Sequence, residues 1–235
     1  MKVDIIQTGS LGNATVLTDS ASNQLLIDCG VKYEAIVPHI GSVYRLSLLI
    51  THKHGDHTAS LQHFSFLGIP SCAPAEVCAE LPFGSQIAEH AQQIQLGEAW
   101  SVLPVKVPHG DCECFAYIIA NKTEKKKIFW ATDLQKLPPI ADTQGWDLIA
   151  VECNYDEDLA IEAATNGTLQ NTGFRNHQSL QALKDWLLCR QNKPSRLCAL
   201  HLSNSGLMPI ELLKTELLPL CGQLIIGKKN TVLTI

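Results

Sequence analysis

The sequence predicts an α/β protein with a four-layer αββα sandwich, in which two mixed β-sheets pack face to face between layers of helices. Strand-like and helix-like segments alternate along the chain. The strand-like segments form two groups, each accompanied by helical segments that can cover it. No low-complexity linker, internal repeat or domain-sized change in composition interrupts the 235 residues. We therefore expect a single α/β domain spanning residues 1–235.

The first half of the chain supplies one sheet and its helices. Strands are expected at Val3–Gln7, Ala14–Thr18, Gln24–Asp28 and Ser47–Thr51. Helices are expected at Tyr33–Ile40 and from His57 to about Leu67. Gly9, Gly12 and Gly30 are expected to serve tight turns.

The second half follows the same plan, beginning with a hairpin-like region from Gln92 to Thr132. Further strands are expected at Asp147–Val151, Arg196–Leu200, Gln223–Ile226 and Thr231–Ile235. Helices are expected at Asp156–Ala164, Gln178–Arg190 and Pro209–Leu218. In the second of these, leucines recur at helical spacing and are expected in the core: Leu180, Leu183, Leu187 and Leu188.

Hydropathy, cysteine content and net charge limit the cellular compartment and the binding partners that we expect for this protein. No apolar run approaches the length of a membrane span, and Met1–Asp4 leads into a strand rather than a signal segment. Nine scattered cysteines suggest reduced thiols, so we expect a cytoplasmic protein. The net charge of −5 argues against an extended, nonspecific grip on nucleic acid, but bound metal ions would supply local positive charge. The basic run Lys122–Lys127 is interpreted as a solvated turn.

Ligand-type residues are concentrated at Thr51–His57. His52, His54, Asp56 and His57 directly follow an apolar strand. Imidazole and carboxylate are common ligands of zinc and related ions. Groups this close would be costly to desolvate unless something bound them. A divalent metal is therefore the simplest explanation, and a solvated histidine-rich loop is the alternative.

Three more ligand-type residues follow predicted strands in the same way: His109, Asp133 and His201. A binuclear site needs about two further imidazoles and an anionic bridge from separate strand ends. Each residue alone is better explained as a loop residue or a hydrogen-bonded histidine. Their common position after short apolar runs predicts that they join the Thr51–His57 cluster.

These features resemble the metallo-β-lactamase superfamily over nearly the whole chain. Three flanking segments look most like its YycJ-like (WalJ) branch: Thr8–Asn13, Glu152–Asn154 and His201–Asn204. One position departs from that branch, because Tyr155 stands where it has a histidine before the aspartate. That branch is associated with nuclease or phosphodiesterase activity.

The resemblance implies a ligand scheme for two divalent metal ions, with Zn²⁺ expected and Mn²⁺ as the alternative. His52, His54 and His109 would hold one ion, Asp56, His57 and His201 the other, and Asp133 would bridge them. A bridging hydroxide would then attack a phosphodiester, with Asp56 orienting it or accepting its proton.

Other residues are weaker candidates. His177 stands just before a predicted helix and can protonate a leaving group, or it is a surface histidine. Substrate contacts are assigned to Ser10, Asn13, Asn154 and Tyr155, with structural loop roles as the alternative. Asp28 either fixes a ligand imidazole or caps a turn. Cys112–Cys114 is interpreted as core packing, although Cys112 lies close enough to His109 to approach the site.

The expected function is hydrolysis of phosphodiester bonds in nucleic acid, exonuclease-like, or in a small nucleotide. The same ligand set also suits a metal-dependent hydrolase of a lactone, β-lactam or thioester. A third hypothesis is a non-catalytic metal-binding protein. No membrane partner is expected, and the sequence leaves the oligomeric state open.

Overall fold

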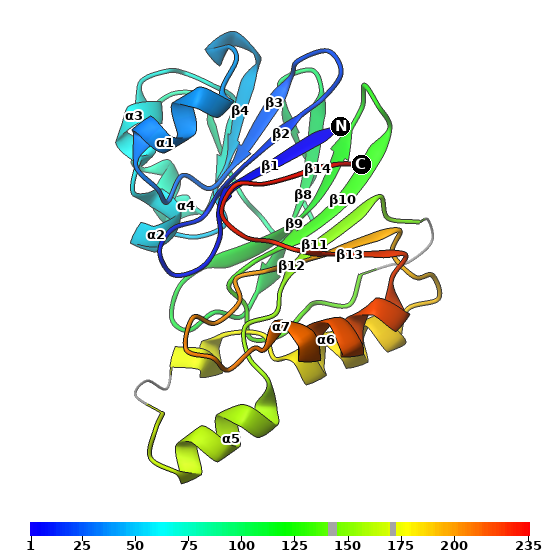
Figure 1. Ribbon diagram of the computed structural model, residues 1–235. Helices are drawn as coiled ribbons and strands as arrows, with labels where there is room; N and C mark the ends of the chain where they lie inside the picture. The colour runs from blue at the N-terminus through cyan, green and yellow to red at the C-terminus, as the bar shows by residue number, and fades with distance from the viewer. Residues whose placement is uncertain (141–144, 170–172) are drawn as a thin grey trace.

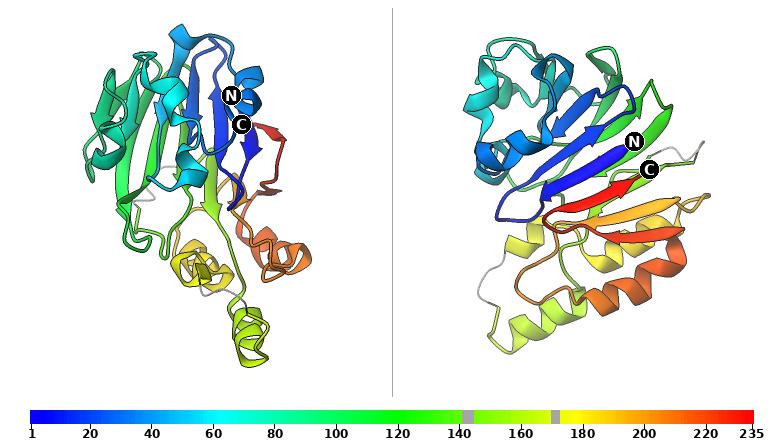
Figure 2. Two further views of the ribbon diagram at one scale, coloured as in Figure 1. Left: turned by 90° about the vertical axis from the view of Figure 1, so that its left-hand side faces the viewer. Right: turned by 45° about the horizontal axis from the view of Figure 1, so that its top comes forward.

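Two seven-stranded sheets pack face to face in the computed structural model, and helices cover their outer faces (Figures 1 and 2). The structure describes residues 1–140, 145–169 and 173–235. This arrangement confirms the predicted αββα sandwich. Among the described residues, no helix has both the length and the apolar character needed to cross a bilayer.

The first sheet, which we call sheet A, has the strand order β14-β1-β2-β3-β4-β5-β6. Its strands are β1 (Lys2–Gln7), β2 (Ala14–Thr18), β3 (Gln24–Ile27), β4 (Leu46–Leu49), β5 (Ser71–Ala73), β6 (Ser85–Ile87) and β14 (Thr231–Thr234). Pairing is antiparallel from β14 to β3 and parallel from β3 to β6.

The second sheet, sheet B, has the order β13-β12-β11-β10-β9-β8-β7. Its strands are β7 (Ile94–Leu96), β8 (Trp100–Val107), β9 (Cys114–Asn121), β10 (Lys126–Ala131), β11 (Leu148–Glu152), β12 (Arg196–Leu200) and β13 (Gln223–Ile226). Pairing is antiparallel from β7 to β10 and parallel from β10 to β13. Both sheets are therefore mixed.

Three apolar clusters hold the layers together. The central cluster joins the inner faces of both sheets, with Leu17 and Leu25 from sheet A and Trp100 and Tyr117 from sheet B. The helices that cover the outer face of sheet A are α1 (Tyr33–Ile36), α2 (Gly55–Thr58), α3 (Leu61–Ser65) and α4 (Ala75–Cys78). The helices on the sheet B side are α5 (Glu157–Thr165), α6 (Leu180–Leu188) and α7 (Ile210–Leu217). Burial of these apolar side chains is the main stabilising term of the fold.

Several predicted elements are shorter than expected. The helix predicted at Tyr33–Ile40 ends at Ile36 and continues as a 3₁₀ turn, Val37–His39. Pro38 explains this, because proline lacks an N–H and disfavours α conformation in the residue before it. The helix predicted from His57 is split into α2 and α3, since Ser60 bonds back to the chain at Cys29 and Val31.

Two further differences concern α6 and the segment from Ser71 to Ile87. In α6, Leu188 was expected in the core but is 59 % exposed, whereas Leu180, Leu183 and Leu187 are buried. The narrow buried stripe of this helix ends one residue before Leu188. The segment from Ser71 to Ile87, for which no element was predicted, forms β5, α4 and β6. These elements have only three or four residues each, too few to show a periodic pattern.

Strand direction brings the candidate residues to one edge of each sheet. β1 runs parallel to β3 and β4 because two antiparallel steps separate it from β3. By the same reasoning, β8 runs parallel to β10, β11 and β12. The loops that follow these strands therefore meet at the carboxyl edge, where α2 lies beside the loop between β1 and β2 (Figure 1).

Candidate metal centre

Three histidines from two loops converge at this edge, and we call them the histidine triad: His52, His54 and His109. Nε2 of His52 lies 2.9 Å from Nδ1 of His54. Nε2 of His109 lies 3.3 Å from the same nitrogen. The nitrogens around a tetrahedral zinc ion are separated by about 3.3 Å, given Zn–N bonds of about 2.0–2.1 Å. The triad is therefore spaced as a metal would require.

A second set, which we call the mixed group, combines two acids and two histidines: Asp56, His57, Asp133 and His201. One ligand atom from each lies within 4.8 Å of the others. Nε2 of His57 is 3.3 Å from Oδ2 of Asp133 and 3.8 Å from Oδ2 of Asp56. Nε2 of His201 is 3.2 Å from Oδ1 of Asp133.

Asp133 lies between the two sets. Its Oδ2 atom is 4.0 Å from Nε2 of His52 and 3.9 Å from Nε2 of His109. Its other oxygen faces His201. A buried carboxylate with imidazoles on both sides is the kind of group that can bridge two cations. Neighbouring histidines hold the pKa of Asp133 well below its usual range against the opposing effect of burial.

Acceptor oxygens of the protein fix the far nitrogen of several of these imidazoles. Nδ1 of His57 lies 2.8 Å from Oδ2 of Asp28, and Nδ1 of His201 lies 3.1 Å from Oε1 of Glu152. Nδ1 of His109 faces the carbonyl of Asn176 at 3.1 Å. Each contact leaves Nε2 directed toward Asp133. Such outer contacts orient metal ligands and fix their tautomers.

Three of these residues have a left-handed backbone. Asp28, Asp133 and His201 have φ values of 57°, 54° and 51°. Each comes directly after a strand or within two residues of its end. Aspartate and histidine tolerate this region better than β-branched residues do, but it still costs energy. The surrounding hydrogen bonds keep these side chains turned into the site.

The donor chemistry of the residues fits divalent cations. His201 is 3 % exposed, yet its Nε2 makes no hydrogen bond to any of the described residues. Burial, reinforced by the neighbouring imidazoles, lowers the pKa of His52 far below its ordinary value, so its ring stays neutral and can donate a lone pair. Burial likewise lowers the pKa of His109. His52 and His109 can therefore bind a metal without first losing a proton.

The other two histidines carry protons when no cation is present. Burial lowers the pKa of His57, but Asp28 and Asp133 outweigh it and raise that pKa well above normal. Asp133 and Glu152 likewise outweigh burial at His201 and raise its pKa to about 9. A cation would replace these protons.

Glu152 is a site residue that the sequence analysis did not select. It is fully buried, and its Oε1 lies 2.6 Å from Nδ1 of His177 and 3.1 Å from Nδ1 of His201. Its Oε2 accepts from the backbone N–H of Leu134 at 2.9 Å. The signal was available, because Glu152 ends a strand just as Asp133 follows one.

His177 lies over the mixed group. Its ring stacks on that of His201 with centroids 5.1 Å apart and an angle of 18°. Burial lowers the pKa of His177, but the Glu152 carboxylate outweighs it and the net shift is upward. His177 is thus half-buried, and its Nδ1 is fixed by Glu152.

The four predicted substrate contacts differ in burial and in the residues that they touch. Nδ2 of Asn13 lies 2.9 Å from Nε2 of His57, and Nδ2 of Asn154 donates to the carbonyl of His201 at 2.9 Å. Both asparagines are buried and hold the ligand loops. Ser10 is exposed on the loop after β1. Tyr155 packs edge-on against Phe174, with centroids 5.0 Å apart.

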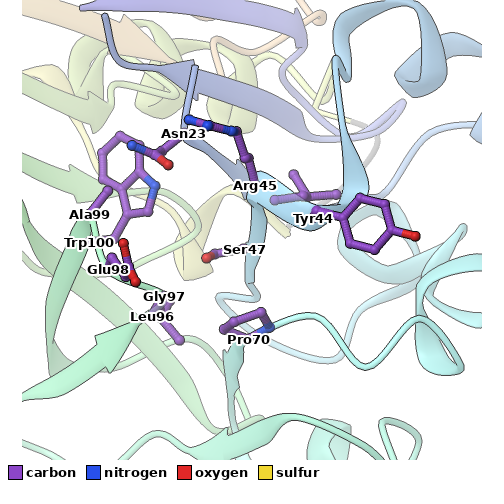
Figure 3. A pocket seen from close by; sticks show the side chains of 11 residues that line it. Asn23, Tyr44, Arg45, Ser47, Pro70, Leu96, Gly97, Glu98, Ala99 and Trp100 are labelled. Carbon is purple, nitrogen blue, oxygen red and sulfur yellow. The ribbon is translucent and has the colours of Figure 1, made fainter. Parts of the chain in front are cut away.

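Two of the cavities formed by the described residues lie outside the ligand cluster. One of about 360 Å³ is lined by Arg45, Ser47, Glu98 and Trp100 among others (Figure 3). It adjoins the start of β4, at the opposite end from the Thr51–His57 loop. The other, of about 820 Å³, lies between Leu137–Ile140 and α6 and includes Gln178, the neighbour of His177.

Comparisons with known proteins identify the family of this chain. A family profile described as "Beta-lactamase superfamily domain" matches residues 23–201. None of the curated proteins searched matches the sequence significantly.

Solved structures share the fold at low sequence identity. The metallo-β-lactamase fold protein YhfI from Bacillus subtilis superposes with a TM-score of 0.73 and 17 % identity, covering 99 % of this chain and 98 % of its own. The short form of human tRNase Z gives 0.68 and 16 %, covering 100 % and 99 %. A diphosphatase from the PhnP family gives 0.67 and 15 %, covering 99 % and 97 %.

Proposed function

The chain belongs to the metallo-β-lactamase superfamily, whose domain profile matches residues 23–201, and on this premise we propose that it is a metal-dependent phosphodiesterase acting on nucleic acid or a small nucleotide. One observation carries the proposal: the histidine triad and the mixed group meet at the shared carboxylate of Asp133. Two of the structural neighbours, named as a tRNase and a diphosphatase, support the phosphate-ester chemistry.

The ligand scheme divides the site into two positions. We propose that the histidine triad holds one ion and that Asp56, His57 and His201 hold the other, with Asp133 between them. When bound, such ions lower the pKa of a water molecule and neutralise charge on a phosphoryl oxygen.

Asp56 is proposed to act on the attacking water as well as on the ion. Its carboxylate belongs to the mixed group but is only partly buried, so it faces both the ligands and the solvent. It can therefore accept a hydrogen bond from an entering water and orient it.

His177 is proposed to protonate the leaving oxygen. Glu152 fixes Nδ1 of His177, which leaves Nε2 as the nitrogen able to donate. Because Glu152 raises the pKa of His177, the ring keeps its proton to higher pH than a free histidine. Glu152 is then a positioning residue, since it acts through His177 and His201.

We also propose that the chain belongs to the YycJ-like branch of the superfamily, which the motifs Thr8–Asn13, Glu152–Asn154 and His201–Asn204 support.

We also propose a cytoplasmic location, supported by the nine cysteines, all of which are free. Ser10 and Tyr155 remain candidate substrate contacts at the rim, whereas Asn13 and Asn154 act through the histidines they touch.

One observation favours a second candidate, hydrolysis of a lactone, β-lactam or thioester. The cavity of about 820 Å³ beside Gln178 has apolar walls that include Leu137, Ile140 and Trp186. Such walls suit an acyl group better than a phosphate.

Substrate panels decide between these chemistries. Zinc- or manganese-loaded protein is assayed on bis-p-nitrophenyl phosphate, labelled RNA and DNA, a lactone and a thioester. We expect cleavage of the phosphodiesters, with a loss of at least about 100-fold in Asp56→Asn and none in the exposed control Asp158→Asn. Turnover of the carbonyl substrates alone would replace the proposal by the second candidate. Failure to cleave any substrate would leave a metal-binding protein without this activity.

A further inference from the structure

We propose that the Cys112 thiolate is a further protein ligand of the ion at the histidine triad, and that it makes this position selective for zinc. The proposal rests on the metal-binding role proposed above. It deepens that role by assigning a residue and a metal preference to one of the two positions.

The position of the sulfur carries the inference. Sγ of Cys112 and one nitrogen from each member of the histidine triad all lie within 4.8 Å of one another. Around a tetrahedral zinc ion, sulfur and nitrogen ligands are separated by about 3.6 Å, given Zn–S bonds of about 2.3 Å. Rotation about the Cα–Cβ bond of Cys112 can cover the remaining difference, which is at most about 1.2 Å.

The thiol has a weak local partner. Sγ donates to the carbonyl of His109 at 3.2 Å, three residues back in the same loop. Thiols are weak donors, so this contact gives way readily to a metal bond. The side chain is half-buried, which leaves it reachable by an ion entering the site.

Neighbouring cysteines do not share this position. Cys114 is buried, and its thiol donates to the backbone carbonyl of Asp133 at 3.4 Å. Cys153, which follows Glu152 in the sequence, is also buried. Within the described part of the chain, Cys112 alone among the cysteines joins a group of metal-ligating atoms.

A sulfur ligand changes which ion the position prefers. On binding, the thiol loses its proton to solvent and the S–H bond is replaced by a sulfur–metal bond. Thiolate is a soft ligand that suits Zn²⁺, whereas Mn²⁺ favours carboxylate, carbonyl and water oxygens. Zinc accepts both imidazole nitrogen and thiolate sulfur as ligands, so the histidine triad and Cys112 supply donors that suit it.

Cobalt substitution tests the bond directly. Co²⁺ is bound to the wild type, to Cys112→Ser and to Cys189→Ser. Cys189 is an exposed cysteine at the C-terminal cap of α6 and serves as the control. We expect a thiolate-to-cobalt charge-transfer band in the near ultraviolet for the wild type and the control, and none for Cys112→Ser. Visible d–d bands should appear in all three.

The cobalt spectrum distinguishes failure of the Cys112 ligand role from failure of the metal centre. Visible bands without a charge-transfer band in the wild type would overturn the role of Cys112 and leave the metal centre standing. A charge-transfer band that survives in Cys112→Ser would also overturn it. Failure of all three proteins to bind cobalt would overturn the metal centre itself.

Selectivity gives a second readout. Competition with a fluorescent chelator should show that Cys112→Ser lowers zinc affinity at least about tenfold and changes manganese affinity by less than about threefold. An equal change for both ions, or none, would contradict the claim.

Alkylation tests the bond between Cys112 and zinc in the wild-type protein, without a substitution. Metal-free and zinc-loaded protein are treated with N-ethylmaleimide, and the modified cysteines are mapped by mass spectrometry. We expect zinc to protect Cys112 and to leave the labelling of Cys189 unchanged. Equal labelling of Cys112 in both states would count against the bond.

Discussion

Oδ2 of Asp28 lies 2.8 Å from Nδ1 of His57, and both side chains are almost completely buried. Oδ1 of Asp28 also accepts from the backbone N–H of Thr51 at 2.8 Å. Asp28 thereby connects the end of β3 to the loop that carries most of the ligands. It fixes the tautomer of His57 so that Nε2 faces Asp133.

Asp28→Asn should weaken the mixed group without unfolding the protein. An amide cannot accept the His57 N–H as strongly as a carboxylate, so the ring loses its orientation. We expect zinc affinity at one of the two positions to fall by about 10–100-fold. Isothermal titration measures this, with Asp147→Asn, which pairs with Lys126 away from the site, as the control. Two unchanged affinities would show that His57 needs no anchor.

Glu152→Gln should change the pH profile of turnover as well as its rate. Because Glu152 raises the pKa of His177, its removal should move the alkaline limb of kcat to lower pH. We also expect kcat to fall about 100-fold. The pH–rate profile on an RNA dinucleotide is the measurement. A lower rate with an unmoved alkaline limb would mean that His177 is not the proton donor.

Stability of the metal-free protein should depend on pH through His201. Folding raises the pKa of His201 from 6.5 to about 9, so the folded state holds this proton more tightly. The resulting stabilisation is fully present below pH 6.5 and is lost as the pH rises through 9. We expect Tm of the metal-free protein to fall by about 5 °C or more across this window, and Tm of the zinc-loaded protein to fall less. Calorimetry in matched buffers checks this, and parallel curves would contradict it.

Acid should also destabilise the metal-free protein, because folding lowers the pKa values of two buried carboxyl groups. Neighbouring histidines lower the pKa values of Asp133 and Glu152 against the effect of burial. Their contribution is present above the carboxyl pKa of the unfolded chain and is lost as the pH falls through the folded values.

Gly30→Ala should disrupt the ligand loop. A Cβ at Gly30 would lie 1.6 Å from the backbone oxygen of Asp56, which cannot move without carrying the loop with it. We expect a loss of at least about 3 kcal/mol in the free energy of unfolding. Gly41→Ala is the control, since its Cβ meets only a side-chain atom of Gln24 at 3.8 Å. Urea denaturation of both variants compares them, and equal stability would refute the close packing.

The layers of the fold were predictable because the longer strands and helices carry clear apolar periods. The short elements were not, since three-residue strands such as Ser71–Ala73 have no period to detect. The helix ends at Ile36 because of Pro38. The prediction extended it to Ile40 because the apolar pattern was given more weight than this proline.

The convergence of the ligand loops could be inferred from a repeated context, a short strand followed at once by His or Asp. Glu152 was overlooked although it ends β11 in the same way. Its role depends on contacts with His177 and His201, which are 25 and 49 positions further along the chain. The sequence alone cannot give such pairings, because strand order determines them.

The most direct test of the account is the location of zinc in crystals of the loaded protein by anomalous scattering. We predict two peaks, one at the histidine triad and one at Asp56, His57 and His201, with the carboxylate of Asp133 between them. Absence of metal from both positions, or peaks only at surface residues away from Asp133, would contradict the proposed enzyme.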